Sequence, residues 1–102
     1  MFIVVNVRNR QEKGEKRVYC GRPSPLGNPY AMRNEKQRNR VCNLYDKHFA
    51  KLLKNDDMVM GAEIERLLEL HKEHGDVTLA CYCAPKRCHV DTIAEHLNQM
   101  IE

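Results

Sequence analysis

The sequence predicts a small α/β domain in which about three helices pack on a three-stranded sheet, in the order β-β-α-α-β-α. Two observations carry this prediction. Short segments typical of strands stand at 2–8, which is rich in β-branched residues, and at 17–20 and 77–81, and the apolar residues elsewhere recur at helical spacing. The length of 102 residues, of which 42% are hydrophobic and 30% charged, is typical of one globular domain covering 1–102.

The three strand segments differ in the pairing that they predict. Residues 2–8 suit a buried first strand, and the short segment 17–20 could pair with it as a hairpin across the polar turn at 9–16. Residues 77–81 are apolar enough to form a central strand. Because a helical crossover precedes this last strand, we expect it to run parallel to one of the first two.

Three helices are predicted from stripes of apolar or half-apolar residues at spacings of three, four and seven. The first begins near residue 34 and has its stripe at Val41, Leu44, Tyr45, His48, Leu52 and Leu53. The second has Ile64, Leu67, Leu68 and His71, and the third has Val90, Ile93, Ala94, Leu97 and Ile101. Residues 55–57 are expected to end the first helix or cap the second, and Gly75 to cap the second at its C-terminus.

Isolated cysteines and histidines are assigned by their neighbours. Cys20 and Cys42 stand in apolar contexts and are expected in the core. We expect His48 and His71 in the core or at its boundary. Two further histidines, His74 and His96, are expected to be exposed.

The charge and the cysteine content limit the class of partner and compartment. A net charge of +3 fits an anionic partner such as a nucleotide or nucleic acid, but does not identify one. No apolar run reaches the ~20 residues of a membrane span, and residues 1–8 predict a strand instead of a signal peptide. We therefore expect a cytoplasmic protein without a membrane partner, whose five cysteines are thiols or metal ligands.

The segment 21–30 directly follows the second predicted strand and contains three prolines and two glycines. The prolines restrict the backbone, so we expect a rigid loop without regular structure. Its glycines, Gly21 and Gly27, permit a close approach of another group to the backbone. A guanidinium, a hydroxyl and an amide from Arg22, Ser24 and Asn28 suit an anionic or sugar-bearing ligand. The alternative is an ordered connection without a ligand.

The densest chemical signal is the C-x-C-x4-C-H pattern at 81–89, for which three interpretations stay open. In the first, a zinc ion is bound by Cys81, Cys83, Cys88 and His89, although the spacing departs from the usual C-x2-C pairs. In the second, the N-terminus of the last helix and the adjacent Lys and Arg lower the pKa of Cys88. Cys88, His89 and Asp91 would then act in catalysis or bind an anion. In the third, the cysteines are small buried side chains.

These segments resemble the domain-of-unknown-function family 4326 of phages and bacteria. The resemblance rests on residues 5–8, on 21–30, and on 81–85 followed by Cys88 and His89, in the same order and over the full length. It implies a small α/β domain, often encoded by a phage and acting in the host cytoplasm. It implies no established activity.

We expect both segments to lie at one edge of the sheet if the second and third strands are parallel, because ligands bind beyond the carboxyl ends of such strands. The leading functional hypothesis is a site for a nucleotide-like or phosphate-bearing small molecule, with or without catalysis. Gly21, Arg22, Ser24, Gly27 and Asn28 would bind it together with the 81–91 segment. The alternative is a non-catalytic phage effector or nucleic-acid-binding module with structural zinc, and a host protein is a further partner class.

Overall fold

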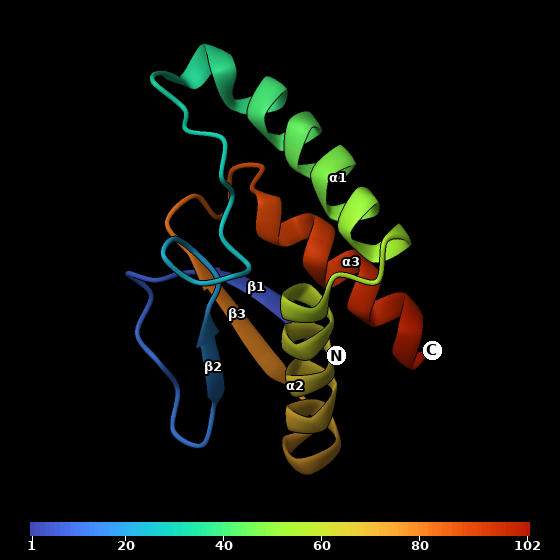
Figure 1. Cartoon of the computed structure of the whole chain (residues 1–102). Helices are drawn as coiled ribbons and strands as arrows, with labels where there is room; N and C mark the ends of the chain where they lie inside the picture. The colour runs from blue at the N-terminus through green and yellow to red at the C-terminus, as the bar shows by residue number, and fades with distance from the viewer.

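The computed structural model describes residues 1–102 and confirms the predicted fold class and element order (Figure 1). The strands are β1 (Phe2–Asn6), β2 (Lys16–Tyr19) and β3 (Val77–Cys81). The α-helices are α1 (Arg38–Lys54), α2 (Met58–His74) and α3 (His89–Ile101), and a 3-10 helix, η1 (Glu35–Gln37), directly precedes α1. No helix is both long and apolar enough to cross a membrane.

The sheet has the order β1-β3-β2, and β3 runs parallel to both neighbours. Leu79 of β3 is in register with Val4 on one side and with Val18 on the other. The proposed hairpin between β1 and β2 is therefore wrong, since β3 lies between them. The reason is burial: all five residues of β3 are buried, so this strand belongs in the centre.

The core lies between one face of the sheet and the helices. Side chains alternate along a strand, and the residues of β3 in the buried apolar cluster are Val77, Leu79 and Cys81. On the opposite face, Ile3 and Tyr19 are each 39% exposed. In Figure 1 the helices accordingly stand to one side of the sheet.

Capping residues mark the ends of the helices, as the sequence predicts for α2. Asp57 caps α2, because its carboxylate accepts a hydrogen bond from the Met60 amide at 2.9 Å. Gly75 ends α2 with a φ of +79°, a left-handed conformation that glycine adopts readily. At the start of α3, the Cys88 amide donates to the carboxylate of Asp91 at 3.0 Å. Asp91 is therefore a capping residue.

The isolated cysteines and histidines follow the predictions with one exception. Cys20 and Cys42 are buried, His48 and His71 are half-buried, and His74 is exposed. His96, however, is half-buried instead of exposed. Its ring stands edge-on to Phe49 at a centroid distance of 5.4 Å, and this aromatic contact holds His96 against α1.

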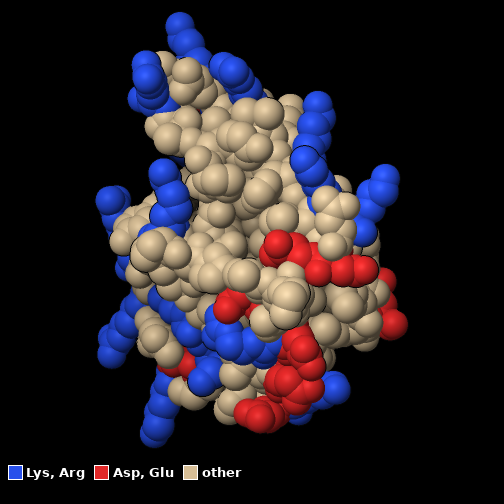
Figure 2. Space-filling view, viewed as in Figure 1, with Lys and Arg blue, Asp and Glu red and all other residues tan.

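Charge is distributed unevenly over the molecule (Figure 2). Residues 33–54, which contain η1 and α1, have seven Lys or Arg and two acidic residues. In Figure 2 the blue side chains accordingly line the upper edge, over these helices, whereas most visible acidic side chains lie over and around α2. The end of the molecule where α1 begins is therefore the more positive one.

The pairing of α3 with the free edge of β1 gives a test of the fold. Asn98 accepts from the Phe2 amide at 2.8 Å and donates to the Phe2 carbonyl at 3.0 Å. We expect Asn98→Ala to lower the free energy of unfolding by about 1–3 kcal/mol, because both backbone groups lose their partner. Urea denaturation measures this, with the exposed neighbour substitution Gln99→Ala as control. Equal stability of the two variants would contradict this role of Asn98.

Candidate functional site

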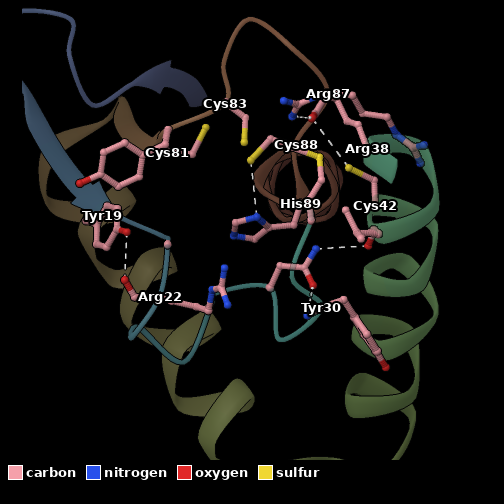
Figure 3. A pocket seen from close by; sticks show the side chains of 15 residues that line it. Tyr19, Arg22, Tyr30, Arg38, Cys42, Cys81, Cys83, Arg87, Cys88 and His89 are labelled. Atoms are coloured by element: carbon pink, nitrogen blue, oxygen red, sulfur yellow. Dashed lines mark hydrogen bonds between the residues drawn. The ribbon is translucent and has the colours of Figure 1, made fainter. Parts of the chain in front are cut away.

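The two motif segments meet at the carboxyl edge of the parallel sheet. Cys20 directly follows β2 and Cys81 ends β3, so the chain leaves both strands at the same edge. There the loop 21–30, the turn 81–89 and the start of α1 surround a pocket of about 400 Å³ (Figure 3). The parallel arrangement on which a shared site depends is thus present.

His89 joins the two segments by a hydrogen bond. Its Nε2 atom lies 2.7 Å from the Cys20 carbonyl, which can only accept, so Nε2 carries the proton. Burial lowers the pKa of His89, which favours the neutral ring. The unprotonated Nδ1 atom then faces the Cys88 sulfur at 3.5 Å. His89 therefore acts as a buried link between the end of β2 and the beginning of α3.

The loop 21–30 is held in place by its own buried side chain. Leu26 is fully buried, and its carbonyl accepts a hydrogen bond from the hydroxyl of Tyr45 in α1 at 3.0 Å. The Ser24 hydroxyl oxygen accepts from the Leu26 amide at 3.1 Å. A Cβ atom at Gly27 would stand 2.9 Å from the Arg22 amide nitrogen, so the loop closes on itself only with glycine there. Ser24 and Gly27 shape the loop and do not line the pocket.

Gly21 makes room for an aromatic wall. A Cβ atom at Gly21 would overlap the hydroxyl of Tyr19, whose ring lies across this glycine. The same hydroxyl donates to the Arg22 carbonyl at 3.0 Å, which fixes the ring. Gly21, Tyr19 and Arg22 all line the pocket.

Asn28 also lines the pocket, but its amide is already engaged. The side-chain nitrogen donates to the Val41 carbonyl of α1 at 3.2 Å, and the side-chain oxygen accepts from the Tyr30 amide at 2.8 Å. Its main role in this structure is to tie the loop to α1.

Three arginines and no carboxylate line the pocket. Arg38 is paired with Glu35 at 2.7 Å, and Arg87 donates to Asn43 at 2.8 Å and lies 3.3 Å from Asp46. The Arg22 guanidinium has neither a hydrogen bond nor an ion pair, and Figure 3 shows it beneath His89 in the pocket. Uncompensated positive charge in the pocket therefore belongs to Arg22.

The thiols of the turn behave differently from the prediction. Cys81 and Cys88 are both buried, and the interaction of their thiols lowers the pKa of Cys81 and raises that of Cys88. The backbone amides of Cys83 and Ala84 lower the pKa of Cys81 further. The lowered pKa expected for Cys88 thus belongs to Cys81, because the neighbouring Cys88 stays a thiol and the backbone amides of the turn favour the Cys81 thiolate.

The four predicted zinc ligands are near one another in sequence but not arranged as a metal site. No group of three or more His, Cys, Asp or Glu side chains is placed to hold a metal ion. The Nε2 atom of His89 is occupied by the Cys20 carbonyl, and Cys83 contacts the Arg38 guanidinium instead. The donor set therefore does not fit tetrahedral zinc as it stands.

The structure brings Gly21, Arg22 and Asn28 together in one pocket with Cys81, Cys83, Cys88 and His89, and other residues line this pocket as well. Asp91, Ser24 and Gly27 are outside the pocket. Eight further lining residues were not predicted as site residues: Tyr19, Tyr30, Met32, Arg38, Val41, Cys42, Tyr82 and Arg87. The three tyrosines had a signal, since each lies within a motif segment or two residues before one. Arg38 belongs to a basic run near the start of the first predicted helix, which favours a solvated helix face, and only the packing of α1 brings it to the pocket.

The thiol pair gives a pH-dependent prediction. Folding lowers the pKa of Cys81 below the ordinary thiol value, so its thiolate stabilises the fold fully above the unfolded pKa of 9.0, and this contribution is lost as the pH falls through the lowered pKa. Thiolate ultraviolet absorbance should show one group that titrates below the ordinary thiol range. Cys81→Ser should remove this step, Cys88→Ala should shift it upward, and Cys42→Ser should leave it unchanged. A step that survives Cys81→Ser would assign it to another group.

No curated protein and no solved structure matches the chain. Residues 5–99 match the protein family described as Domain of unknown function (DUF4326), which confirms the resemblance that the two motif segments indicate. This match covers nearly the whole fold, from β1 to the last turn of α3. The chain therefore belongs to the DUF4326 family.

Proposed function

We propose that the protein binds a nucleotide-like or other small phosphate-bearing ligand in the pocket between the two motif segments. The observation that carries this proposal is the unpartnered guanidinium of Arg22 in a pocket that no carboxylate lines. A guanidinium matches phosphate oxygens with two parallel hydrogen bonds and gains most from them where water is partly excluded. Arg22 is therefore the direct contact to the phosphate.

Two further arginines line the pocket and favour an anionic ligand, although the guanidinium groups of both already have partners within the protein. Arg38 and Arg87 are held by Glu35, Asn43 and Asp46, so they are fixed at the pocket before a ligand arrives. Their charge adds to the positive end of the molecule over η1 and α1 (Figure 2). The volume of about 400 Å³ suits a small molecule.

The thiols supply the chemistry if the site is catalytic. A neutral His89 with Nδ1 at 3.5 Å from the Cys88 sulfur is the pairing that thiol chemistry uses, with Asp91 positioning Cys88 through its amide. Catalysis by Cys88, His89 and Asp91 stays a prediction. Binding is the part of the proposal that the unpartnered arginine supports.

Substitution of Arg22 tests the proposal. We expect Arg22→Ala to weaken binding of ribose 5-phosphate by about 10- to 150-fold, since one charge-assisted contact contributes about 1.5–3 kcal/mol. Arg22→Lys should retain part of the affinity. Isothermal titration calorimetry measures both, with the exposed Arg10→Ala, outside the pocket, as control. Equal affinity of Arg22→Ala and the unsubstituted protein would overturn the proposal.

The alternative, a phage effector or nucleic-acid-binding module with structural zinc, makes an opposite prediction. It requires one metal ion per chain and unfolding in a chelator. From the placement of the four side chains we expect native mass spectrometry to show the metal-free mass, and the protein to stay folded in chelator. One tightly held zinc ion would instead favour the alternative and require the turn 81–89 to rearrange.

A further inference from the structure

The aromatic residues of this protein divide into two groups by burial. The chain has two Phe and four Tyr and no Trp. Phe2, Phe49 and Tyr45 are at most 3% exposed and belong to the core. Tyr19, Tyr30 and Tyr82 are 39%, 38% and 65% exposed, and all three line the pocket. Every exposed aromatic side chain of the molecule is therefore at the proposed site.

Two of these rings form one wall. Tyr19 and Tyr82 meet edge to face, with a centroid distance of 5.9 Å and an angle of 81° between the rings. Tyr19 is fixed by its hydrogen bond to the Arg22 carbonyl and by its position across Gly21. Tyr82 has no hydrogen bond from its hydroxyl and no second ring partner, so most of its ring faces solvent.

The third ring stands opposite. Tyr30 packs edge-on against His48 of α1 at 6.0 Å. In Figure 3, Tyr19 and Tyr30 lie on opposite sides of the pocket with Arg22 between them. The pocket thus has an unpaired cation on its floor and aromatic rings at its sides.

We propose that the ligand contains a nucleobase, which stacks on the Tyr82 and Tyr19 rings while its phosphate contacts Arg22. This inference rests on the proposed function and decides between its two forms, a nucleotide and a sugar phosphate. Stacking of a base on an exposed aromatic side chain contributes about 1–3 kcal/mol to the binding free energy, and it does so for every base. A sugar phosphate has no such surface and would leave the rings without a role.

The clustering also argues against chance exposure. Single exposed apolar side chains are common, but rings gathered at one concave site mark a place where another molecule covers them. Arg22, Arg38 and Arg87 at the same site select an anion. A molecule with a base and a phosphate matches both the aromatic rings and the arginines. Such a molecule is a free nucleotide or a nucleotide within a single strand.

The experiment compares ribose 5-phosphate with adenosine 5′-monophosphate, which differ by the base. We expect the nucleotide to bind at least about 5-fold tighter, because stacking contributes about 1 kcal/mol or more. Tyr82→Ala should weaken nucleotide binding by about 5- to 150-fold and leave ribose 5-phosphate binding unchanged. Tyr82→Phe should keep the nucleotide affinity, since the ring remains. Met58→Ala, an exposed apolar residue outside the pocket, is the control.

Equal affinities for the two phosphates, or equal losses for both in Tyr82→Ala, would overturn the nucleobase inference and leave phosphate binding intact. Failure of both phosphates to bind would instead overturn the proposed function itself. A tetranucleotide distinguishes the two sources of the base. Tighter binding of the tetranucleotide than of the mononucleotide assigns the base to a single strand, and weaker binding assigns it to a free nucleotide; both results support base recognition.

Discussion

The buried hydrogen bond from His89 to the Cys20 carbonyl is the contact on which the site depends. It joins residues that are 69 positions apart, at the end of β2 and the start of α3, over a distance of 2.7 Å. Because the carbonyl can only accept, the bond also fixes which ring nitrogen carries the proton, and it directs Nδ1 to the thiol of Cys88. One interaction thus connects the end of β2 to the start of α3 and sets the tautomer of the histidine between them.

This contact is possible because of the sheet topology. With β3 between β1 and β2 and all three strands parallel, the segments after β2 and β3 leave the sheet at one edge. A β3 strand parallel to β1 but antiparallel to β2 would have placed these segments at opposite ends. Burial of Leu26 and its hydrogen bond from Tyr45 then fix the loop on α1. A site built in this way is formed before the ligand binds, which reduces the entropy lost on binding.

Local patterns predict much of this fold, whereas contacts across the sheet do not follow from them. The periodicity of apolar residues located the helices, and Asp57 and Gly75 marked the ends of α2 correctly, since these signals act within a few residues. The pairing of β2 with β3 instead of β1, the proximity of Cys81 to Cys88, and the position of Arg38 at the pocket depend on tertiary packing. The pKa is lowered at Cys81 instead of Cys88 for the same reason, because the group that interacts most strongly with Cys81 is the buried thiol of Cys88.

The central claim is that the loop 21–30 and the turn 81–89 form one ligand-binding site. The most direct measurement is a titration of the ¹⁵N-labelled protein with adenosine 5′-monophosphate, followed through its backbone amide resonances. The account predicts that amides of residues 21–28 and 81–89 shift together, with one dissociation constant, while those along the acidic exposed face of α2 stay in place. Shifts confined to one of the two segments, or centred on α2, would contradict it.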